Sequence, residues 1–207
     1  NQFHEVLSKF NVSLIGGDTT KGALSITVQA MGLCEKDKVL RRDRAEVKDK
    51  VFVTGWLGDA AVGLQAIADK IEAEVLISCI NRLNRPEARV MFAQDLVQYS
   101  KCAIDISDGL VADLGHVLSA SHCGARIDLS TIPISPAVRH YFEIYHNNIV
   151  DWSMVLTRGD DYELCFTLDH DDESAVIELA EQYDLQISCI GELTDSGEEV
   201  FIDANKR

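Results

Sequence analysis

The chain has 207 residues, with 34 Asp and Glu side chains against 19 Lys and Arg, and a formal net charge of −15. This balance argues against nucleic acid or an anionic membrane surface as the main partner, because both require a cationic protein surface. Hydrophobic residues at 46% and charged residues at 26% are typical of a globular protein, and the length can bury a real core.

The predicted elements of the first part of the chain are a helix over 2–10, strands over Val12–Ile15 and Leu24–Leu33, a basic loop over 36–50, and a buried strand over Val51–Thr54. Asp59 is expected to cap a helix over Ala60–Lys70, which is apolar on one face. Further helices are predicted over 72–81 and 86–99, with Pro86 in the first turn of the second.

The remaining predicted elements are strands over Ala103–Ile106, Arg126–Leu129, Tyr162–Leu168, Ile187–Leu193 and Val200–Ile202, and helices over Gly109–Ser121, Pro136–Tyr145 and Asp171–Asp184. Gly124 is expected to end the helix that begins at Gly109. Helices and strands alternate unevenly. This pattern favours an α/β (α+β) sandwich with a mixed sheet.

The six cysteines are scattered singly, and none of them forms a C-x-x-C pair. Single cysteines in apolar segments are typical of reduced core residues, so we expect a cytoplasmic protein. The longest uncharged stretch, Gly22–Cys34, has 13 residues and is too short to span a bilayer. The first residues are already polar, so no signal peptide is expected.

Three constellations could carry chemistry. The first is Gly16-Gly17-Asp18-Thr19 at the end of a predicted strand. Two glycines let the backbone approach a ligand closely, and the carboxylate that follows could hold a hard cation. A plain turn, in which Asp18 bonds its own backbone, is the favoured alternative on spacing alone.

The second constellation is Asp105-Ile106-Ser107-Asp108-Gly109, where a strand leads into a helix. Asp105 and Ser107 should share one face of the strand end, because side chains alternate along a strand. The start of the helix offers free N–H groups that suit phosphate, and the two carboxylates could hold Mg²⁺ bound to that phosphate. The alternative is that Ser107 or Asp108 is only a helix cap.

The third constellation is Arg158-Gly159-Asp160-Asp161-Tyr162-Glu163, a loop that enters a strand. Adjacent carboxylates repel one another, which a site can use to hold a cation. A solvated acidic loop is the alternative, since residues 158–199 carry 14 acidic residues and one basic one. The basic loop over 36–50 offers Arg41, Arg42 and Arg44 to phosphates, or is simply exposed.

Four segments together closely resemble the thiamine-monophosphate kinase family. They read LIGGDTTKGALSITVQAMG (14–32), VLRRDRAEVKDKVFVTGWLGDAAVGL (39–64), AIDISDGLVADLGHVLSASHCGARIDLSTIP (103–133) and GDDYELCFT (159–167). The resemblance implies the aminoimidazole-ribonucleotide synthetase-like fold. It implies that 1–33 is the tail of an N-terminal ATP-binding domain, and that 34–207 is a C-terminal α/β domain truncated at its end.

The resemblance also implies ATP-dependent phosphorylation of thiamine monophosphate to thiamine diphosphate, with several Mg²⁺ ions and a homodimeric full-length protein. Carried over by motif, Asp18, Asp105 and Asp108 are Mg²⁺ ligands, and Gly17 lies beside the nucleotide. Arg42 and Ser107 would contact the ATP phosphates, and Asp160 the cationic thiamine moiety. Arg42 and Asp105 are thereby implied as catalytic residues.

Two alternatives stay open. One is a related selenophosphate synthetase-like enzyme, whose reactive residue would lie in a region that precedes this sequence. The other is that these 207 residues alone form a non-catalytic domain, because half-built metal sites bind weakly. We therefore expect the isolated chain to have little or no kinase activity.

Overall fold

The computed structural model describes residues 2–36 and 38–202. The chain divides into two compact units, residues 1–35 and residues 36–207. The division falls two residues after the predicted boundary between residues 33 and 34. That the first unit is the tail of a larger domain stays a prediction.

The first unit contains one helix, α1 (Gln2–Lys9), at the predicted place. The predicted strands over Val12–Ile15 and Leu24–Leu33 are wrong, because residues 10–35 form loops and turns. A strand exists only where a neighbour supplies the ladder of hydrogen bonds. Leu24 is 93% exposed and Ile26 is 83% exposed, so the alternation of apolar residues has no sheet to join within residues 2–35.

The second unit is built on one six-stranded sheet. Its strands are β1 (Lys50–Thr54), β2 (Cys102–Ile106), β3 (Gly124–Asp128), β4 (Glu163–Leu168), β5 (Ile187–Thr194) and β6 (Glu199–Ile202). Their order across the sheet is β2-β4-β1-β5-β3-β6. The pair of β3 and β6 is parallel and the other pairs are antiparallel. The sheet is therefore mixed, as predicted.

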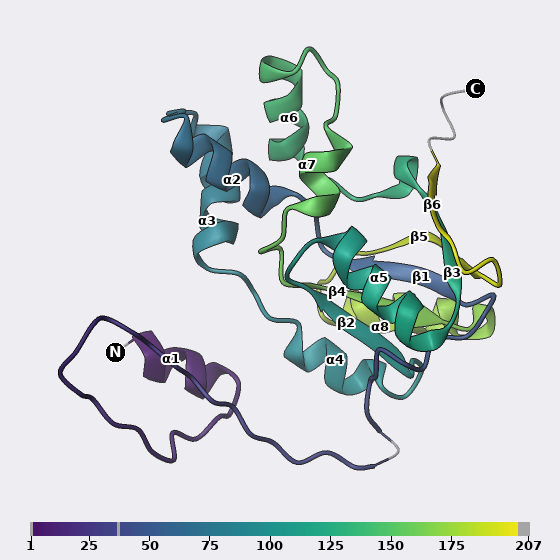
Figure 1. Cartoon of the computed structure of the whole chain (residues 1–207), viewed down its shortest axis with the longest axis horizontal. Coiled ribbons are helices and arrows are strands. Elements are labelled where there is room, and N and C mark those ends of the chain that lie inside the picture. Colours follow the sequence, from purple (N-terminus) through teal and green to yellow (C-terminus); the bar gives the residue numbers. More distant parts are fainter. Residues whose placement is uncertain (1, 37, 203–207) are drawn as a thin grey trace. The chain divides into compact units, whose positions relative to one another are not determined.

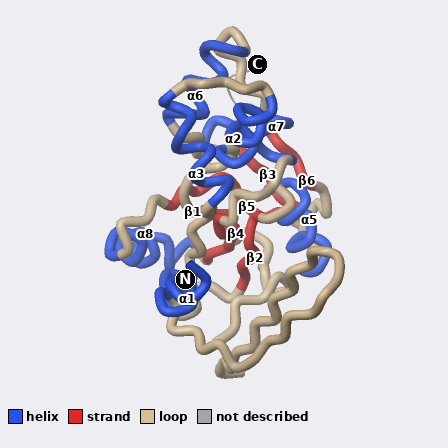
Figure 2. The backbone as a smooth tube through the Cα atoms, turned by 90° about the vertical axis from the view of Figure 1, so that its left-hand side faces the viewer, coloured by secondary structure: helices blue, strands red, loops and turns tan. Residues whose placement is uncertain are grey.

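Helices cover both faces of this sheet. Figure 2 shows α5 (Leu110–Ser121) and α8 (Glu173–Gln182) on opposite sides of the strands. Alternation along β1 explains the two layers, because Val51 and Val53 face the core that includes α5, while Phe52 faces α4 (Val90–Leu96) and α8. The predicted α/β sandwich is thus confirmed.

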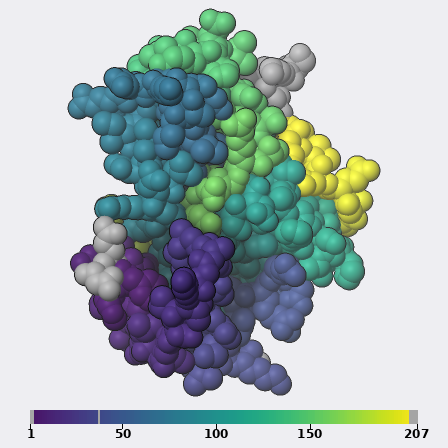
Figure 3. Space-filling view, turned by 60° about the vertical axis from the view of Figure 1, so that its left-hand side comes forward, coloured from purple at the N-terminus to yellow at the C-terminus, as the bar shows by residue number. Residues whose placement is uncertain are grey.

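Four further helices gather at one end of the sheet (Figures 1 and 3). They are α2 (Asp59–Ala68), α3 (Ile77–Asn84), α6 (Pro136–Tyr145) and α7 (Trp152–Thr157). Short 3-10 turns occur at Glu74–Leu76, Leu129–Thr131 and His170–Asp172. Helix α6 has the predicted bounds, whereas α7 was not predicted. Within residues 2–36 and 38–202, every helix is too short or too polar to cross a membrane.

One predicted helix start and one predicted helix cap are wrong. The helix expected over 86–99 begins only at Val90, and Pro86 lies in the loop before it. Arg89, the residue before the helix, is held by two hydrogen bonds to Glu163 of β4. Helix α5 ends at Ser121, as predicted, but its cap is His122, with a left-handed φ of 56°, and Gly124 instead opens β3.

Candidate functional site

A cavity of about 590 Å³ lies along the edge strand β2 and the start of α5. It brings together four of the predicted site residues, Arg42, Asp105, Ser107 and Asp108. Asp105 and Ser107 both line it, as the alternation of side chains along the strand predicts. The rest of its lining consists of Leu40, Ala103, Ile104, Asp113, His116 and Leu164.

The turn between β2 and α5 is held from behind by Asp113. Oδ2 of Asp113 accepts the amide hydrogens of Ser107 and Asp108, each at 2.9 Å, and the Asp113 side chain is buried. These two amides are therefore not free for phosphate. The predicted phosphate site at the start of the helix concerns the amides of the first turn of α5, and it stays a prediction. The alternative that Ser107 or Asp108 caps the helix is wrong, because the cap residue is Gly109 and no side chain caps it.

The acidic loop before β4 docks onto the same turn. The amide of Asp160 donates to the Ser107 carbonyl at 2.9 Å, and the amide of Tyr162 donates to the Ile106 carbonyl at 2.8 Å. A Cβ atom at Gly159 would lie 1.8 Å from the Ser107 carbonyl oxygen, so only glycine permits this approach. Residues far apart in the sequence thereby meet at one end of the β2–β4 pair.

The hydroxyl of Tyr162 contacts one predicted acid, and the charges of two others raise its pKa. That hydroxyl donates to Oδ1 of Asp160 at 3.4 Å. Burial raises the pKa of Tyr162, and the charges of Asp160, Asp105 and Asp108 raise it further. Asp160 and Tyr162 both have left-handed backbone, with φ of 67° and 50°, which is costly for an aromatic residue. Strained backbone of this kind often marks functional loops.

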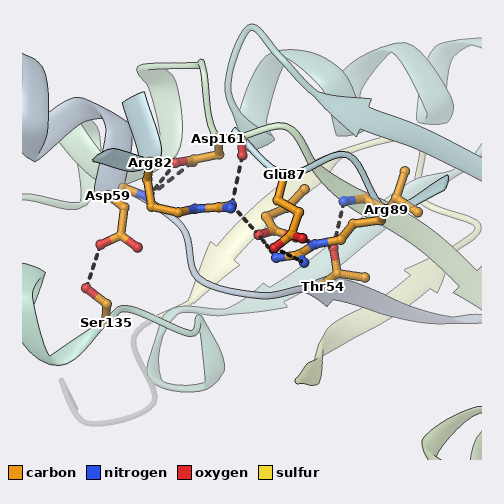
Figure 4. A network of polar contacts seen from close by, with 10 residues as sticks. Thr54, Asp59, Arg82, Glu87, Arg89, Ser135 and Asp161 are labelled. Carbon is orange, nitrogen blue, oxygen red and sulfur yellow. Dashed lines mark hydrogen bonds and ion pairs between the residues drawn. The ribbon is translucent and has the colours of Figure 1, made fainter. Parts of the chain in front are cut away.

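The other two carboxylates of this loop are structural. Glu163 is fully buried and accepts hydrogen bonds from Thr54 at 2.6 Å, Arg82 at 2.5 Å and Arg89 at 2.7 and 2.8 Å (Figure 4). Asp161 is also buried. The interpretation of a solvated acidic loop is therefore wrong for both, because internal partners hold their carboxylates inside the protein.

Asp161, rather than Asp59, meets the start of α2. Both carboxylate oxygens of Asp161 lie within 3.2 Å of the Gly58 amide, which is the cap position of the helix. Asp59 makes no cap and instead accepts hydrogen bonds from Ser135 at 2.5 Å and Cys79 at 3.4 Å (Figure 4). Burial raises the pKa of Asp161 to about 7, against the opposing effect of the backbone hydrogen bonds.

The three arginines of the basic loop lie in different surroundings. Arg41 forms a bidentate pair with Asp43 at 2.7 and 2.6 Å. Arg42 faces the cavity, and its backbone carbonyl accepts from Ser121 at 3.1 Å. Arg44 lines a different, acidic depression of about 320 Å³ together with Asp169 and Asp171. Arg42 is thus the arginine of this loop that lies among the predicted site residues.

Gly17 and Asp18 lie in the first unit. They help to line a cavity of about 710 Å³ that is formed by residues of that unit alone. Oδ1 of Asp18 accepts the amide hydrogen of Thr19 at 2.7 Å, as the plain-turn interpretation predicts. Whether these residues join the cavity beside β2 stays a prediction.

Metal and thiol chemistry have few candidate groups. Across residues 2–36 and 38–202, no three His, Cys, Asp or Glu side chains gather in an arrangement that could hold a metal ion by themselves. All six cysteines are free, and Cys79, Cys102, Cys123 and Cys165 are buried.

Two residues that line the cavity were not predicted from the sequence: Asp113 and His116. Asp113 and His116 are three residues apart on α5, so they lie on neighbouring positions of one helix face, and both line the cavity. The signal for Asp113 was a charged residue among the apolar positions of the first turn. Tyr162 belongs to the third predicted constellation, but no role was predicted for it, because an aromatic residue at a strand entrance is typical of a core.

Comparison with known proteins supports this region as the shared core of a family. Residues 46–204 match the family model described as AIR synthase related protein, C-terminal domain. The thiamine-monophosphate kinase of Buchnera aphidicola subsp. Acyrthosiphon pisum is 38% identical over 197 residues, which are 94% of this chain and 60% of the relative. The enzyme of the same name from Escherichia coli K12 is 38% identical, over 92% of this chain and 58% of the relative.

Solved structures give the same relationship. The crystal structure of thiamine-monophosphate kinase from Stenotrophomonas maltophilia K279a is 36% identical with a TM-score of 0.73, covering 79% of this chain and 53% of that chain. AaThiL complexed with AMPPCP and TMP is 28% identical with a TM-score of 0.67, covering 81% of this chain and 52% of that chain. The chain therefore spans little more than half the length of such relatives. It belongs to the AIR synthase related family, and its residues 46–204 match the C-terminal domain of that family.

Proposed function

We propose that this chain is the C-terminal portion of an ATP-dependent kinase that phosphorylates thiamine monophosphate to thiamine diphosphate. The observation that carries the proposal is the cavity beside β2, where Arg42, Asp105, Ser107 and Asp108 meet. The relatives with this sequence pattern are named thiamine-monophosphate kinases, and AaThiL was solved complexed with AMPPCP and TMP.

The donor set of the cavity suits Mg²⁺. Carboxylate and hydroxyl oxygens are hard ligands, and Mg²⁺ in kinases uses one or two carboxylates together with substrate phosphates and water. Asp105 and Asp108 would supply those carboxylates, with Ser107 beside them, so two protein ligands suffice without a complete protein cage. Mg²⁺ bound there would neutralise phosphate charge during transfer.

The side chains of the chain itself would orient the two substrates. The guanidinium group of Arg42 presents a planar fork to phosphate oxygens and would hold the nucleotide phosphates in the cavity. Asp160 is exposed near Tyr162 and would attract the cationic ring of thiamine monophosphate. The acceptor phosphate would then lie between the two groups, and an in-line attack requires little more than this alignment.

The remaining parts of the proposal concern the intact protein. We assign Gly17 to the nucleotide and Asp18 to Mg²⁺ by their motif, and we expect a homodimer. The free cysteines fit the reducing cytoplasm, where we expect the enzyme to act.

A coupled assay for ADP formation with thiamine monophosphate tests the function of the intact protein. Asp105→Asn should abolish most turnover, because it removes one carboxylate charge from the cavity, while the circular dichroism spectrum stays unchanged. Asp128→Asn is a matched control, since Asp128 caps the turn at Ser130 and lies outside the cavity lining. Equal turnover in wild type and Asp105→Asn would remove Asp105 from the site. A wild type that forms no ADP with this substrate would refute the function.

The same assay tests the expectation for residues 1–207 alone. Turnover by these residues should be low compared with the intact protein, because a site built from few carboxylates holds metal weakly. Robust turnover by this chain would refute that part of the proposal.

A further inference from the structure

We infer that Asp113 is a positioning residue, which turns the loop between β2 and α5 into a cation site. This inference rests on the proposed function. Its basis is the pair of 2.9 Å hydrogen bonds through which one buried carboxylate oxygen accepts the amides of Ser107 and Asp108. Asp113 is not a ligand in this scheme, but it acts through the two residues whose side chains line the cavity beside it.

The chemistry of the turn depends on where its amides point. A turn at the start of a helix, with free N–H groups, is a ready anion site. Here the carboxylate of Asp113 already occupies the two amides, so a phosphate cannot use them without displacing a buried charge. The polar side chains that this turn and the end of β2 present to the cavity are the Ser107 hydroxyl and the carboxylates of Asp105 and Asp108. Oxygen donors with net negative charge select a cation.

Other contacts fix the same turn from its remaining sides. The Ser107 carbonyl accepts the Asp160 amide at 2.9 Å. Gly109 has a φ of 110°, and a Cβ atom there would lie 2.9 Å from the Leu156 carbonyl oxygen. The backbone of the turn is therefore constrained on both flanks, and Asp113 supplies the constraint at its centre. Residues that orient metal ligands in this way typically change metal affinity by 10–100-fold when they are lost.

Position and charge can be separated with three variants of Asp113. Asp113→Asn keeps an oxygen acceptor at the same place but removes the charge. Asp113→Glu keeps the charge but moves it by one methylene. Asp113→Ala removes both. If Asp113 acts by positioning, the Asn variant should keep most Mn²⁺ binding and the Glu and Ala variants should lose it. If only its charge matters, the Asn variant should lose the binding and the Glu variant should keep it.

The measurement is Mn²⁺ binding to the intact protein, followed by the loss of the free Mn²⁺ signal in electron paramagnetic resonance. The relevant binding is the part that Asp105→Asn abolishes. We expect Asp113→Glu and Asp113→Ala to weaken this part by at least about tenfold, Asp113→Asn to retain most of it, and Asp128→Asn to leave it unchanged. Thermal denaturation identifies any variant that does not fold, and the Asn and Glu pair decides the question if the Ala variant fails.

Three results would overturn the inference: Mn²⁺ binding that does not depend on Asp105, wild-type binding in Asp113→Glu, or a loss in Asp113→Asn as large as in Asp113→Glu. The binding assay is independent of turnover. If the expected pattern of Mn²⁺ binding occurs in a protein that forms no ADP with thiamine monophosphate, the proposed function fails and the role of Asp113 stands.

Discussion

The carboxyl group of Asp161 should make the stability of this protein depend on pH near neutrality. Burial at the start of α2, together with the nearby charges of Asp59 and Glu163, raises its pKa to about 7. The amide of Gly58 donates to its carboxyl group, whereas Arg82 donates to its backbone carbonyl, at 3.3 Å, and not to the carboxyl group. Its neighbours therefore leave the charged form poorly compensated.

The sign and size follow from proton linkage. Between about pH 4 and pH 7 the folded protein keeps the proton on Asp161, whereas the unfolded chain releases it. The contribution to stability is therefore full at low pH and is lost as the pH rises through 7. A shift from a usual pKa near 4 to about 7 corresponds to a loss of about 2.5 kcal/mol between pH 5 and pH 8.

Asp161→Asn removes the titration but keeps an oxygen that can accept from Gly58. Urea denaturation of wild type and variant at pH 5, 6, 7 and 8 should show that the free energy of unfolding of the variant, relative to wild type, rises with pH by about 2.5 kcal/mol. Ser100→Ala is a control, because it deletes buried hydrogen bonds without a titrating group and should cost the same at every pH. Parallel pH profiles for wild type and Asp161→Asn would refute the reasoning.

Two further predictions concern the same loop. Glu163→Ala leaves two arginines without their shared carboxylate, so thermal denaturation should show that the free energy of unfolding falls by about 3–5 kcal/mol. A fall below about 1 kcal/mol would contradict the buried network. Gly159→Ala would force a Cβ atom against the Ser107 carbonyl and displace Asp160. Steady-state kinetics of the intact protein should therefore show a fall of about 10²-fold in kcat/KM for thiamine monophosphate. An unchanged kcat/KM would show that this loop does not contact the substrate.

Much of the fold of the second unit could be predicted from local patterns. The apolar face of α5, with Leu110, Leu114, Val117 and Leu118, repeats at helical spacing, and all four side chains are buried. Helix α6 has the predicted bounds because Ser135 caps it and Pro136 starts it. The residues that define this helix start lie next to one another in the sequence, so the start can be predicted without knowledge of distant contacts.

The errors occur where a distant partner decides the local structure. The segment Leu24–Leu33 alternates like a strand, but among the described residues 2–35 of its unit no neighbour pairs with it. The region after Pro86 would allow a helix, but the ion pair of Arg89 with Glu163 delays the helix to Val90. Local propensity is weak compared with such contacts, because a buried charge must be satisfied wherever its partner lies.

The sequence by itself determined the mixed α/β class, the helix and strand positions of the core, and the motifs that carry the family resemblance. Only the tertiary structure decided which acids of those motifs are available for chemistry. Asp161 and Glu163 lie within three residues of Asp160 in the sequence, yet internal hydrogen bonds hold their carboxylates inside the protein. Asp113, which carried no predicted role, binds the amides of Ser107 and Asp108 just before α5. The reason is that burial and hydrogen bonding depend on distant chain segments, such as Gly58 for Asp161 and Thr54 for Glu163, which no local pattern contains.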